Sequence, residues 1–304
     1  MSTRDSLSTS SPPDQAPSQP SKYPKSLEHA PLPITPYLGA CQTDTPQIEV
    51  DDSQGGGSFV AFLHRPVSDP SSTTSSSFRD RHVGAILLSG AGGGVTGPSG
   101  IYLSIADKLA SLPDGQAIPT LRMDYRYPAR NKFCVPDVLS AMDWLQYKSG
   151  LGLSHFVLGG WSFGGAPVFT VGGKDRRVIG AATIASQTAE TEGIKQLAPS
   201  PVLLLHGTGD RTLSHSCSQR LYEQYGSTHG KRTMHLFPGD DHALTRNSKK
   251  AEEMICGFMV RCAGVKMGDP VKHKLEEDLG PDTKRDKVEF MEKGGDLNGP
   301  ERIE

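Results

Sequence analysis

The chain lacks the features that identify membrane, secreted and nucleic-acid-binding proteins most directly. No apolar stretch among its 304 residues approaches the length of about 18 that a transmembrane helix needs. The N-terminus has no apolar segment of the kind found in a signal peptide. The formal net charge is only -2 and no basic stripe is visible, which argues against nucleic acid as a partner. We therefore expect no membrane span, no secretion and no nucleic-acid partner.

Cysteine is also scarce, and its spacing excludes the usual cysteine-based scaffolds. The five cysteines are odd in number, scattered, and include no C-x-x-C pair; they are Cys41, Cys134, Cys217, Cys256 and Cys262. This pattern fits a reducing compartment better than a disulfide framework or a zinc site. We expect a cytoplasmic protein with no bound metal, and the sequence leaves its oligomeric state open.

Hydrophobic residues are few as well, 35% of the chain, and the deficit is concentrated at its two ends. Residues 1–46 are rich in Ser and Pro, and residues 267–304 are dense in Lys, Asp, Glu and Gly. Such compositions offer too little apolar surface to offset the entropy lost on folding, so both tails are predicted to be disordered. A Ser-rich stretch at 71–77 predicts a surface loop. The remaining residues, 47–266, suffice for one well-cored domain.

Between the tails, short apolar runs alternate with stretches of helical pattern. Most of the runs are continuously apolar, as in strands buried on both faces of a parallel sheet. The predicted strands are 59–64, 83–90, 120–127, 155–161, 178–186, 201–207 and 233–239. The predicted helices are 101–112, 136–148, 165–171, 216–225 and 248–263. Pro136 and Asp137 indicate the start of the second helix. This alternation predicts a three-layer α/β domain.

The strongest local motif is GGWSFGG, which follows the apolar run HFVL. Within it Gly160, Ser162 and Gly164 form the pattern Gly-x-Ser-x-Gly. A sharp strand-to-helix turn of this kind lifts a serine hydroxyl above the sheet, and the glycines leave room for the neighbouring backbone. We predict that Ser162 is a nucleophile. The alternative is a glycine-rich turn whose serine only caps a helix.

Two further groups follow in the chain order that such a nucleophile requires. Asp210 comes just after the predicted strand PVLLLHG, and His242 lies in the loop after the next strand. Sites in parallel sheets form at the carboxyl ends of the strands, so the three residues should meet at one edge. The order Ser162, Asp210, His242 is that of the α/β hydrolases. We predict His242 as general base and Asp210 as the acid that orients it.

Other residues could take these places. Asp210 itself lies in a sequence suited to a turn. Asp240 and Asp241 are competing acids, although residues adjacent to His242 are poorly placed to hold the far side of its ring. His206 ends its strand and is expected to be structural.

An oxyanion hole requires backbone N–H groups that point at the developing negative charge. Phe163, which follows the predicted nucleophile, should supply one of them. The loop GAGGGVTGPSG after the strand at 83–90 should supply the other, from Ala91 or Gly92. The sequence does not decide between these two.

The same loop carries a rival hypothesis, a dinucleotide-binding oxidoreductase. Gly92, Gly94 and Gly97 match G-x-G-x-x-G, and Asp124 ends the next strand as a ribose-binding acid would. Pro98 would delay the following helix and so weaken a phosphate site at its N-terminus. The hypothesis also leaves the three predicted catalytic residues unexplained, and we expect Asp124 instead to support the neighbouring loops.

At these motifs the sequence resembles the α/β-hydrolase superfamily, in particular its small members of the dienelactone hydrolase, carboxylesterase and thioesterase types. The resemblance covers about Gln47 to Lys266 and is carried by GAGGG, GWSFGG, HGTGD and GDDH. It implies an α/β-hydrolase fold with a mostly parallel central sheet. It also implies hydrolysis of a small-molecule ester, thioester, lactone or activated amide through an acyl-enzyme, without a cofactor.

Two features qualify this resemblance. Many relatives have a histidine before the glycines of the oxyanion loop, where this chain has Ser89. Only residues 188–200 separate two of the predicted strands, which leaves no room for the cap domain that many relatives insert there. An alternative outside the enzyme class is a catalytically silent scaffold used for binding, although such a scaffold has no reason to keep all three catalytic groups.

Overall fold

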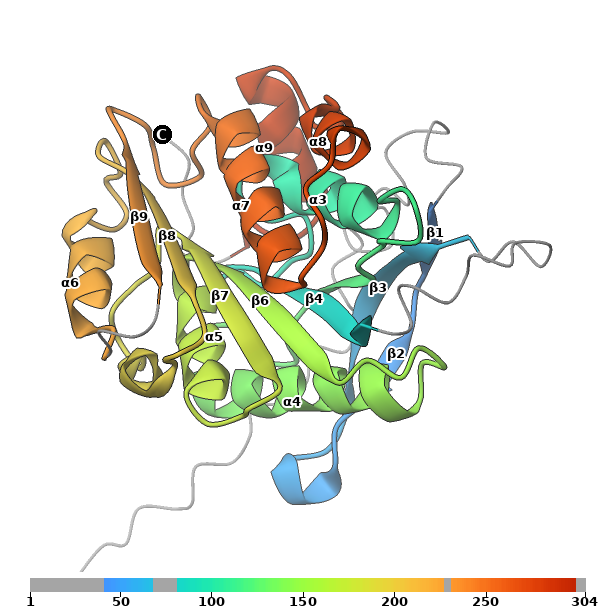
Figure 1. Ribbon diagram of the computed structural model, residues 1–304. Coiled ribbons are helices and arrows are strands. Elements are labelled where there is room, and N and C mark those ends of the chain that lie inside the picture. The colour runs from blue at the N-terminus through green and yellow to red at the C-terminus, as the bar shows by residue number, and fades with distance from the viewer. Residues whose placement is uncertain (1–40, 68–80, 227–230, 299–304) are drawn as a thin grey trace, which may run out of the picture.

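The computed structural model describes residues 41–67, 81–226 and 231–298. They form a central sheet covered by helices on both faces (Figure 1). This arrangement confirms the predicted three-layer α/β class. Residues 1–40, most of the predicted N-terminal tail, and the predicted loop at 71–77 lie outside the described residues.

The sheet is mixed, with a parallel body and an antiparallel edge. Its strands run in the order β1-β3-β5-β4-β6-β7-β8-β9, and β2 pairs with β3. The pairings of β3 with β1, β2 and β5 are antiparallel, whereas all pairings from β5 to β9 are parallel. The strands are β1 (Cys41–Asp44), β2 (Gln47–Glu49), β3 (Ser58–Pro66), β4 (Val83–Leu88), β5 (Thr120–Met123), β6 (His155–Trp161), β7 (Val178–Ile184), β8 (Val202–Gly207) and β9 (Arg232–Phe237).

The inner parallel strands lie where the sequence predicts them because their apolar runs are buried on both faces. Every residue of β4 and β8 is buried, and β9 at the edge is largely exposed. One core packs between the sheet and helices α4 and α5, and a second packs between the sheet and helices α3 and α7. The helices are α3 (Ile101–Ala110), α4 (Asn131–Tyr147), α5 (Gly165–Gly172), α6 (Ser216–Gln224), α7 (Ser248–Cys262), α8 (Asp269–Glu276) and α9 (Lys284–Lys293).

Helix α4 begins earlier than predicted. Pro136 lies inside the helix, which starts at Asn131. The amides of Phe133 and Cys134 both bond to the Arg130 carbonyl, which adds a turn before the proline. Asp137 is therefore not a first-turn residue, and its Oδ1 instead accepts from Arg126 Nε at 2.5 Å.

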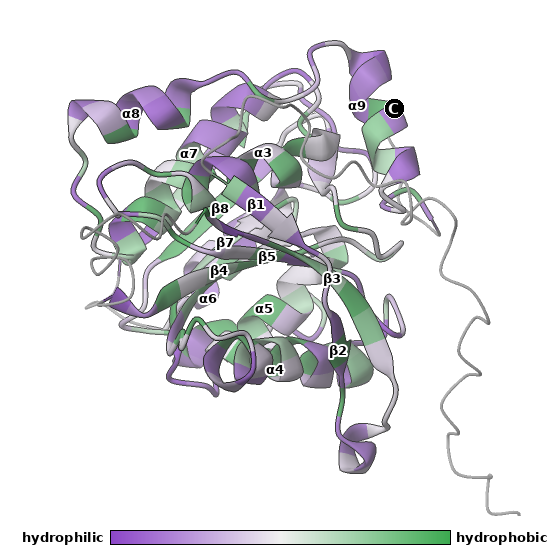
Figure 2. Ribbon diagram, turned by 90° about the vertical axis from the view of Figure 1, so that its right-hand side faces the viewer, coloured by the Kyte–Doolittle hydropathy of each residue, from purple (hydrophilic) through white to green (hydrophobic). Residues whose placement is uncertain are grey.

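The expectation of a disordered C-terminal tail at 267–304 is wrong for the part that the structure describes. Helices α8 and α9 pack on the α3 and α7 side of the domain, with mostly hydrophilic colouring along their length (Figure 2). Each contributes apolar side chains that are buried, namely Val271, Leu275 and Met291. A short apolar stripe on a charged helix is enough for docking when it meets an existing core.

A buried ion pair strengthens the docking of α8. Lys108 Nζ lies 2.5 Å from Glu252 Oε1, and both side chains are almost fully buried. Lys108 Nζ also donates to the Leu275 carbonyl at 3.0 Å, so the pair joins α3 and α7 to α8. Among the helices of the described ranges, none combines the length and hydropathy needed to cross a bilayer.

Candidate active site

The motif around Ser162 forms a tight turn between β6 and α5. The 3-10 helix η3 (Ser162–Gly164) follows β6 directly, and Ser162 has a φ of 54°. A side chain at Gly160 would come within 2.6 Å of the Gly164 carbonyl oxygen, and one at Gly164 within 2.6 Å of the Ser89 carbonyl oxygen. Only glycine fits at these approaches, as the sequence predicts. The left-handed backbone at Ser162 is strained for a non-glycine residue, and such strain is typical of functional sites.

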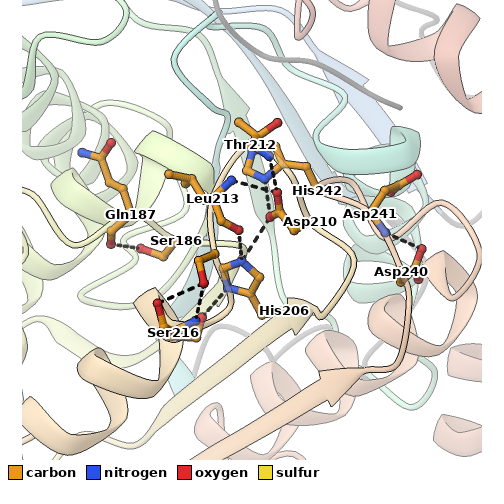
Figure 3. Close-up of polar contacts among 12 residues, drawn as sticks. Ser186, Gln187, His206, Asp210, Thr212, Leu213, Ser216, Asp240, Asp241 and His242 are labelled. Carbon is orange, nitrogen blue, oxygen red and sulfur yellow. Dashed lines mark hydrogen bonds and ion pairs between the residues drawn. The ribbon is translucent and has the colours of Figure 1, made fainter.

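Asp210 and His242 meet at the carboxyl ends of β8 and β9. Asp210 follows β8, and His242 lies in the loop after β9. His242 Nδ1 lies 2.6 Å from Asp210 Oδ2, and both side chains are buried (Figure 3). The backbone amides of Thr212 and Leu213 each donate to Asp210 Oδ1 at 2.8 Å. The acid is thus held in a fixed orientation toward the imidazole.

Asp210 is kept ionised by its surroundings. Burial alone would raise the pKa of its carboxyl, but hydrogen bonds from His206 and His242 outweigh burial and hold that pKa well below its ordinary value. A carboxylate only accepts hydrogen bonds, so the proton shared with His242 sits on Nδ1. Nε2 of His242 is then the nitrogen that can accept a proton.

His206, which the sequence indicates as a structural residue rather than the base, belongs to this cluster. Its Nε2 lies 3.1 Å from Asp210 Oδ2 and 3.0 Å from the Leu213 carbonyl oxygen, and its Nδ1 lies 2.8 Å from Ser218 Oγ (Figure 3). Both neighbours of Nε2 are acceptors, so Nε2 carries the proton and Nδ1 accepts from Ser218. The spacing of His and Asp in HGTGD, four residues apart at a strand end, is the signal that could have indicated this contact.

The two competing acids shape the loop that carries His242. Asp240 accepts from the backbone and side-chain nitrogens of Asn247 at 3.0 and 2.8 Å. Asp241 accepts from the backbone nitrogen and the hydroxyl of Thr245. In Figure 3 these acids lie beside the Asp210–His242 contact, and the Asp241 amide donates to Asp240. Their hydrogen bonds stabilise the loop before α7.

Trp161 connects the serine turn to the histidine loop. Its Nε1 donates to the His242 carbonyl at 3.0 Å, and the two rings lie 5.4 Å apart. Ser162 directly follows this tryptophan. Ser162 is 4% exposed and His242 is 2% exposed, so both residues are buried at the strand ends rather than lying on the outer surface. The structure therefore brings the three predicted residues to one edge of the sheet.

The predicted oxyanion residues lie on two segments in contact. The loop after β4 reaches the serine turn, since a side chain at Gly164 would strike the carbonyls of Leu88 and Ser89. Phe163 is buried in that turn, against the ring of Tyr125. Ala91 and Gly92 follow in the loop, and both remain candidates for the second donor.

The glycines of the rival dinucleotide motif are covered by the chain itself. A side chain at Gly92 would lie 1.9 Å from the Asn298 carbonyl oxygen, and one at Gly94 would lie 2.5 Å from the Asp296 nitrogen. The Gly97 amide, where a phosphate would be expected, donates to Asp296 Oδ1 at 2.8 Å. Helix α3 starts only at Ile101, after a 3-10 turn at Pro98–Gly100, in line with the delay expected from the proline.

Asp124 supports this loop, as expected. Its Oδ1 accepts from the amides of Gly94 at 2.9 Å and Tyr125 at 2.7 Å. Burial raises the pKa of Asp124 to about 6, and the nearby Asp296 adds to the rise. Burial likewise raises the pKa of Asp296 to about 6. The loop thus sits between two buried carboxyl groups.

One group among the described residues has the composition of a metal-ligand set, namely Cys41, His64 and Asp107. It lies on β1, β3 and α3. His64 Nδ1 is 2.6 Å from Asp107 Oδ1, and Arg122 Nε donates to His64 Nε2 at 2.9 Å. Burial and the Arg122 charge lower the pKa of His64 to about 4. A fully buried guanidinium beside the ring disfavours a second cation, so we interpret the group as a structural hydrogen-bond network.

Comparison with known proteins agrees with the geometry. The model of the Dienelactone hydrolase family matches residues 114–258, a span that includes Ser162, Asp210 and His242. A search of curated proteins gives no match.

Several solved structures share the fold. Est1E from Butyrivibrio proteoclasticus is 17% identical with a TM-score of 0.54, and the match covers 72% of this chain and 99% of that one. A dienelactone hydrolase from Anabaena variabilis is 15% identical with a TM-score of 0.55, covering 72% and 98%. An alpha-beta serine hydrolase homologue from Coxiella burnetii is 17% identical with a TM-score of 0.53, covering 72% and 96%. The family match and the fold confirm the predicted classification as an α/β hydrolase resembling the dienelactone hydrolases.

Proposed function

We propose that this α/β hydrolase is a serine hydrolase that cleaves an ester or thioester through an acyl-enzyme on Ser162. Lactones and activated amides are open to the same chemistry. The observation that carries the proposal is the contact of 2.6 Å between His242 Nδ1 and Asp210 Oδ2 at the strand edge where Ser162 occupies its strained turn. His242 acts as general base, and Asp210 fixes its tautomer and orientation.

The proposed reaction proceeds in two balanced steps. The Ser162 oxygen adds to the acyl carbonyl while its proton passes to His242 Nε2. The tetrahedral intermediate then expels the alcohol or thiol, which takes that proton. In the second step water loses a proton to His242 and attacks the acyl carbon, and Ser162 leaves with the proton. The backbone amides of Phe163 and of Ala91 or Gly92 stabilise the oxyanion in both steps.

The connection between β7 and β8 bears on the substrate. It is described in full and holds the 3-10 helix η4 (Glu192–Gln196) rather than a cap domain. An uncapped site suits small or protruding acyl groups.

All five cysteines are free thiols, which supports the proposal of a reducing, cytoplasmic location.

The contacts of the glycine loop, residues 89–100 after β4, weaken the dinucleotide alternative. The amides of Thr96 and Gly97 bond to a carboxylate of the chain itself, so a pyrophosphate would have to displace it. A catalytically silent scaffold could have the same arrangement of residues as an enzyme, so only a measurement of reactivity separates the two.

Labelling with a fluorophosphonate tests the proposal and both alternatives. We expect the probe to modify Ser162 in the full chain, and Ser162→Ala to abolish labelling and hydrolysis of a panel of esters, thioesters and lactones. Ser214→Ala, at an exposed serine of the loop after Asp210, is the matched control and should behave like the wild type. Hydrolysis that survives in Ser162→Ala would refute the proposal.

A further inference from the structure

The C-terminal strap, residues 284–298, spans two loops of the proposed site. It comprises helix α9 and the turn after it. At one end Lys287 Nζ donates to the Thr245 carbonyl at 2.8 Å, three residues after His242. At the other end Asp296 enters the glycine loop that follows β4. The strap therefore bridges the histidine loop and the predicted oxyanion loop.

Asp296 is fully buried and is bound by four donors of the glycine loop. Its Oδ2 accepts from the Thr96 amide at 2.9 Å and from the Thr96 hydroxyl at 2.6 Å. Its Oδ1 accepts from the Gly97 amide at 2.8 Å and from the Ser89 hydroxyl. The Val95 amide also donates to the Gly294 carbonyl at 3.1 Å. These contacts connect segments about 200 residues apart.

The hydrogen-bond donors around Asp296 can all be satisfied by a carboxylic group but not by an amide. Each oxygen of Asp296 meets one main-chain N–H, from Thr96 or Gly97, and a main-chain N–H cannot reverse its polarity. An asparagine would place its NH₂ group against one of these donors and leave both groups unsatisfied, which disfavours an amide at this position. The glycine at position 94 is needed because any side chain there would strike Asp296. The glycine motif is therefore a carboxylate-binding loop for the chain's own Asp296.

The same loop contains the candidate oxyanion donors. Ala91 and Gly92 lie between Ser89, which donates to Asp296, and Thr96, which does so twice. The Asn298 and Asp296 carbonyls lie against Gly92, so the strap also contacts this stretch directly. Asp296 thus fixes both ends of the segment whose amide must point at the oxyanion.

We propose that Asp296 is a positioning residue for the oxyanion loop, and that the strap holds this loop in its catalytic conformation. The proposal rests on the serine hydrolase function proposed above. An oxyanion donor acts mainly in the transition state. Loss of Asp296 should therefore lower kcat and leave KM nearly unchanged, whereas a merely structural contact would affect stability alone.

The test compares Asp296→Ala and Asp296→Asn with Glu292→Gln in the full chain. Glu292 is exposed on α9, within the same strap, so its variant controls for loss of a charge. Removal of one oxyanion donor costs about a hundredfold to a thousandfold in kcat, and partial displacement should cost less. We expect Asp296→Ala and Asp296→Asn to lose tenfold or more, roughly, in kcat, with unchanged KM and with Glu292→Gln at the wild-type value.

Formate gives a second measurement. In Asp296→Ala it can occupy the vacated carboxylate position, so sodium formate should restore part of kcat in a saturable manner while sodium chloride at equal concentration should not. Formate should have no effect on the wild type. Wild-type kcat in Asp296→Ala, or a reduced kcat that formate does not restore, would overturn the proposal.

Circular dichroism decides whether each variant is folded. If Asp296→Ala does not fold, Thr96→Val and Ser89→Ala carry the test, because each removes one hydroxyl donor to Asp296 and keeps the carboxylate. We expect each to lower kcat by roughly threefold or more, and wild-type kcat in both would overturn the proposal. A wild type that neither reacts with a fluorophosphonate nor hydrolyses the ester panel would refute the proposed function itself, whereas an active wild type with fully active strap variants would refute this inference alone.

Discussion

His206 Nε2 lies 3.1 Å from Asp210 Oδ2, the same carboxylate oxygen that His242 contacts. One oxygen of the acid is therefore shared by two imidazoles, one of them held by Ser218 on its far side. A second donor of this kind restrains the carboxylate that orients the proposed base, in the way that outer ligands orient a metal-bound histidine.

We predict that His206→Phe lowers kcat by about tenfold without loss of the fold, because Asp210 Oδ2 loses one of its two donors and is then held less firmly toward His242. His206→Gln should retain more activity, since an amide NH₂ can replace Nε2–H. Ser218→Ala, which leaves the Asp210 contact intact, serves as the matched control. Steady-state kinetics on one ester would check this, and equal activity in all three variants would show that His206 does not support the acid.

Activity should rise with pH through the ionisation of one histidine. In the proposed mechanism His242 must be neutral to accept the Ser162 proton, and an unperturbed histidine has a pKa of about 6.5. The pKa of Asp210 is held well below its ordinary value. This acid therefore stays ionised over the pH range in which a histidine titrates, and it adds no second ionisation to the pH profile of activity. A profile of kcat/KM from pH 5 to 9 would check the prediction. A rate that fell as the pH rose from 5 to 8 would contradict general-base catalysis by His242.

Asp124→Asn should stabilise the protein more at pH 8 than at pH 4. Burial raises the pKa of Asp124 from 3.8 to about 6, so the folded state binds this proton more tightly than the unfolded state. The destabilisation of the folded state by the Asp124 charge is absent below the unfolded pKa of 3.8. It grows as the pH rises from there to about 6 and is constant at higher pH. Both hydrogen bonds end on Oδ1, which an amide oxygen can replace. Urea unfolding at both pH values should show a difference of order 1–3 kcal/mol, and an equal effect at both would contradict the prediction.

Deletion of residues 268–304 should destabilise the domain. It removes the buried side chains of Val271, Leu275 and Met291, each contributing about 1.5–3 kcal/mol when fully buried. We expect the free energy of unfolding to fall by at least about 3 kcal/mol. Deletion of residues 1–25, whose composition offers little to bury, is the comparison and should leave the melting temperature unchanged. Equal melting temperatures for both deletions would show that residues 268–304 contribute nothing to stability.

The sheet and the serine turn could be predicted because their signals are local. Continuous apolar runs marked β4, β6, β7 and β8, and the glycines around Ser162 follow from the space available in the turn. The meeting of Asp210 with His242 follows from parallel topology, which brings strand ends to one edge. The start of α4 was misplaced because a proline is also tolerated beyond the first turn when earlier residues extend the helix.

Other features depend on contacts between distant segments and leave little trace in the sequence. Strands β1 and β2 are only 4 and 3 residues long, too short for a pattern to emerge. The strap has one fully buried apolar side chain, Met291, among many charged residues, so its composition resembles that of a solvated tail. The role of Asp296 depends on its partners in the glycine loop, which no local pattern could indicate.

Because Asp296 follows every residue of the proposed site in the chain, the site is completed in a fixed order during translation. Ribosomes add about 5–20 residues per second, so Asp296 emerges seconds after His242 and after every other residue of the proposed site. Until then the nascent chain can hold its serine, acid and base while its glycine loop still lacks the carboxylate that binds it. Hydrolytic competence should therefore arise only after all three proposed catalytic residues have been made, and a transcript truncated before the strap would yield a protein with these three side chains and little turnover.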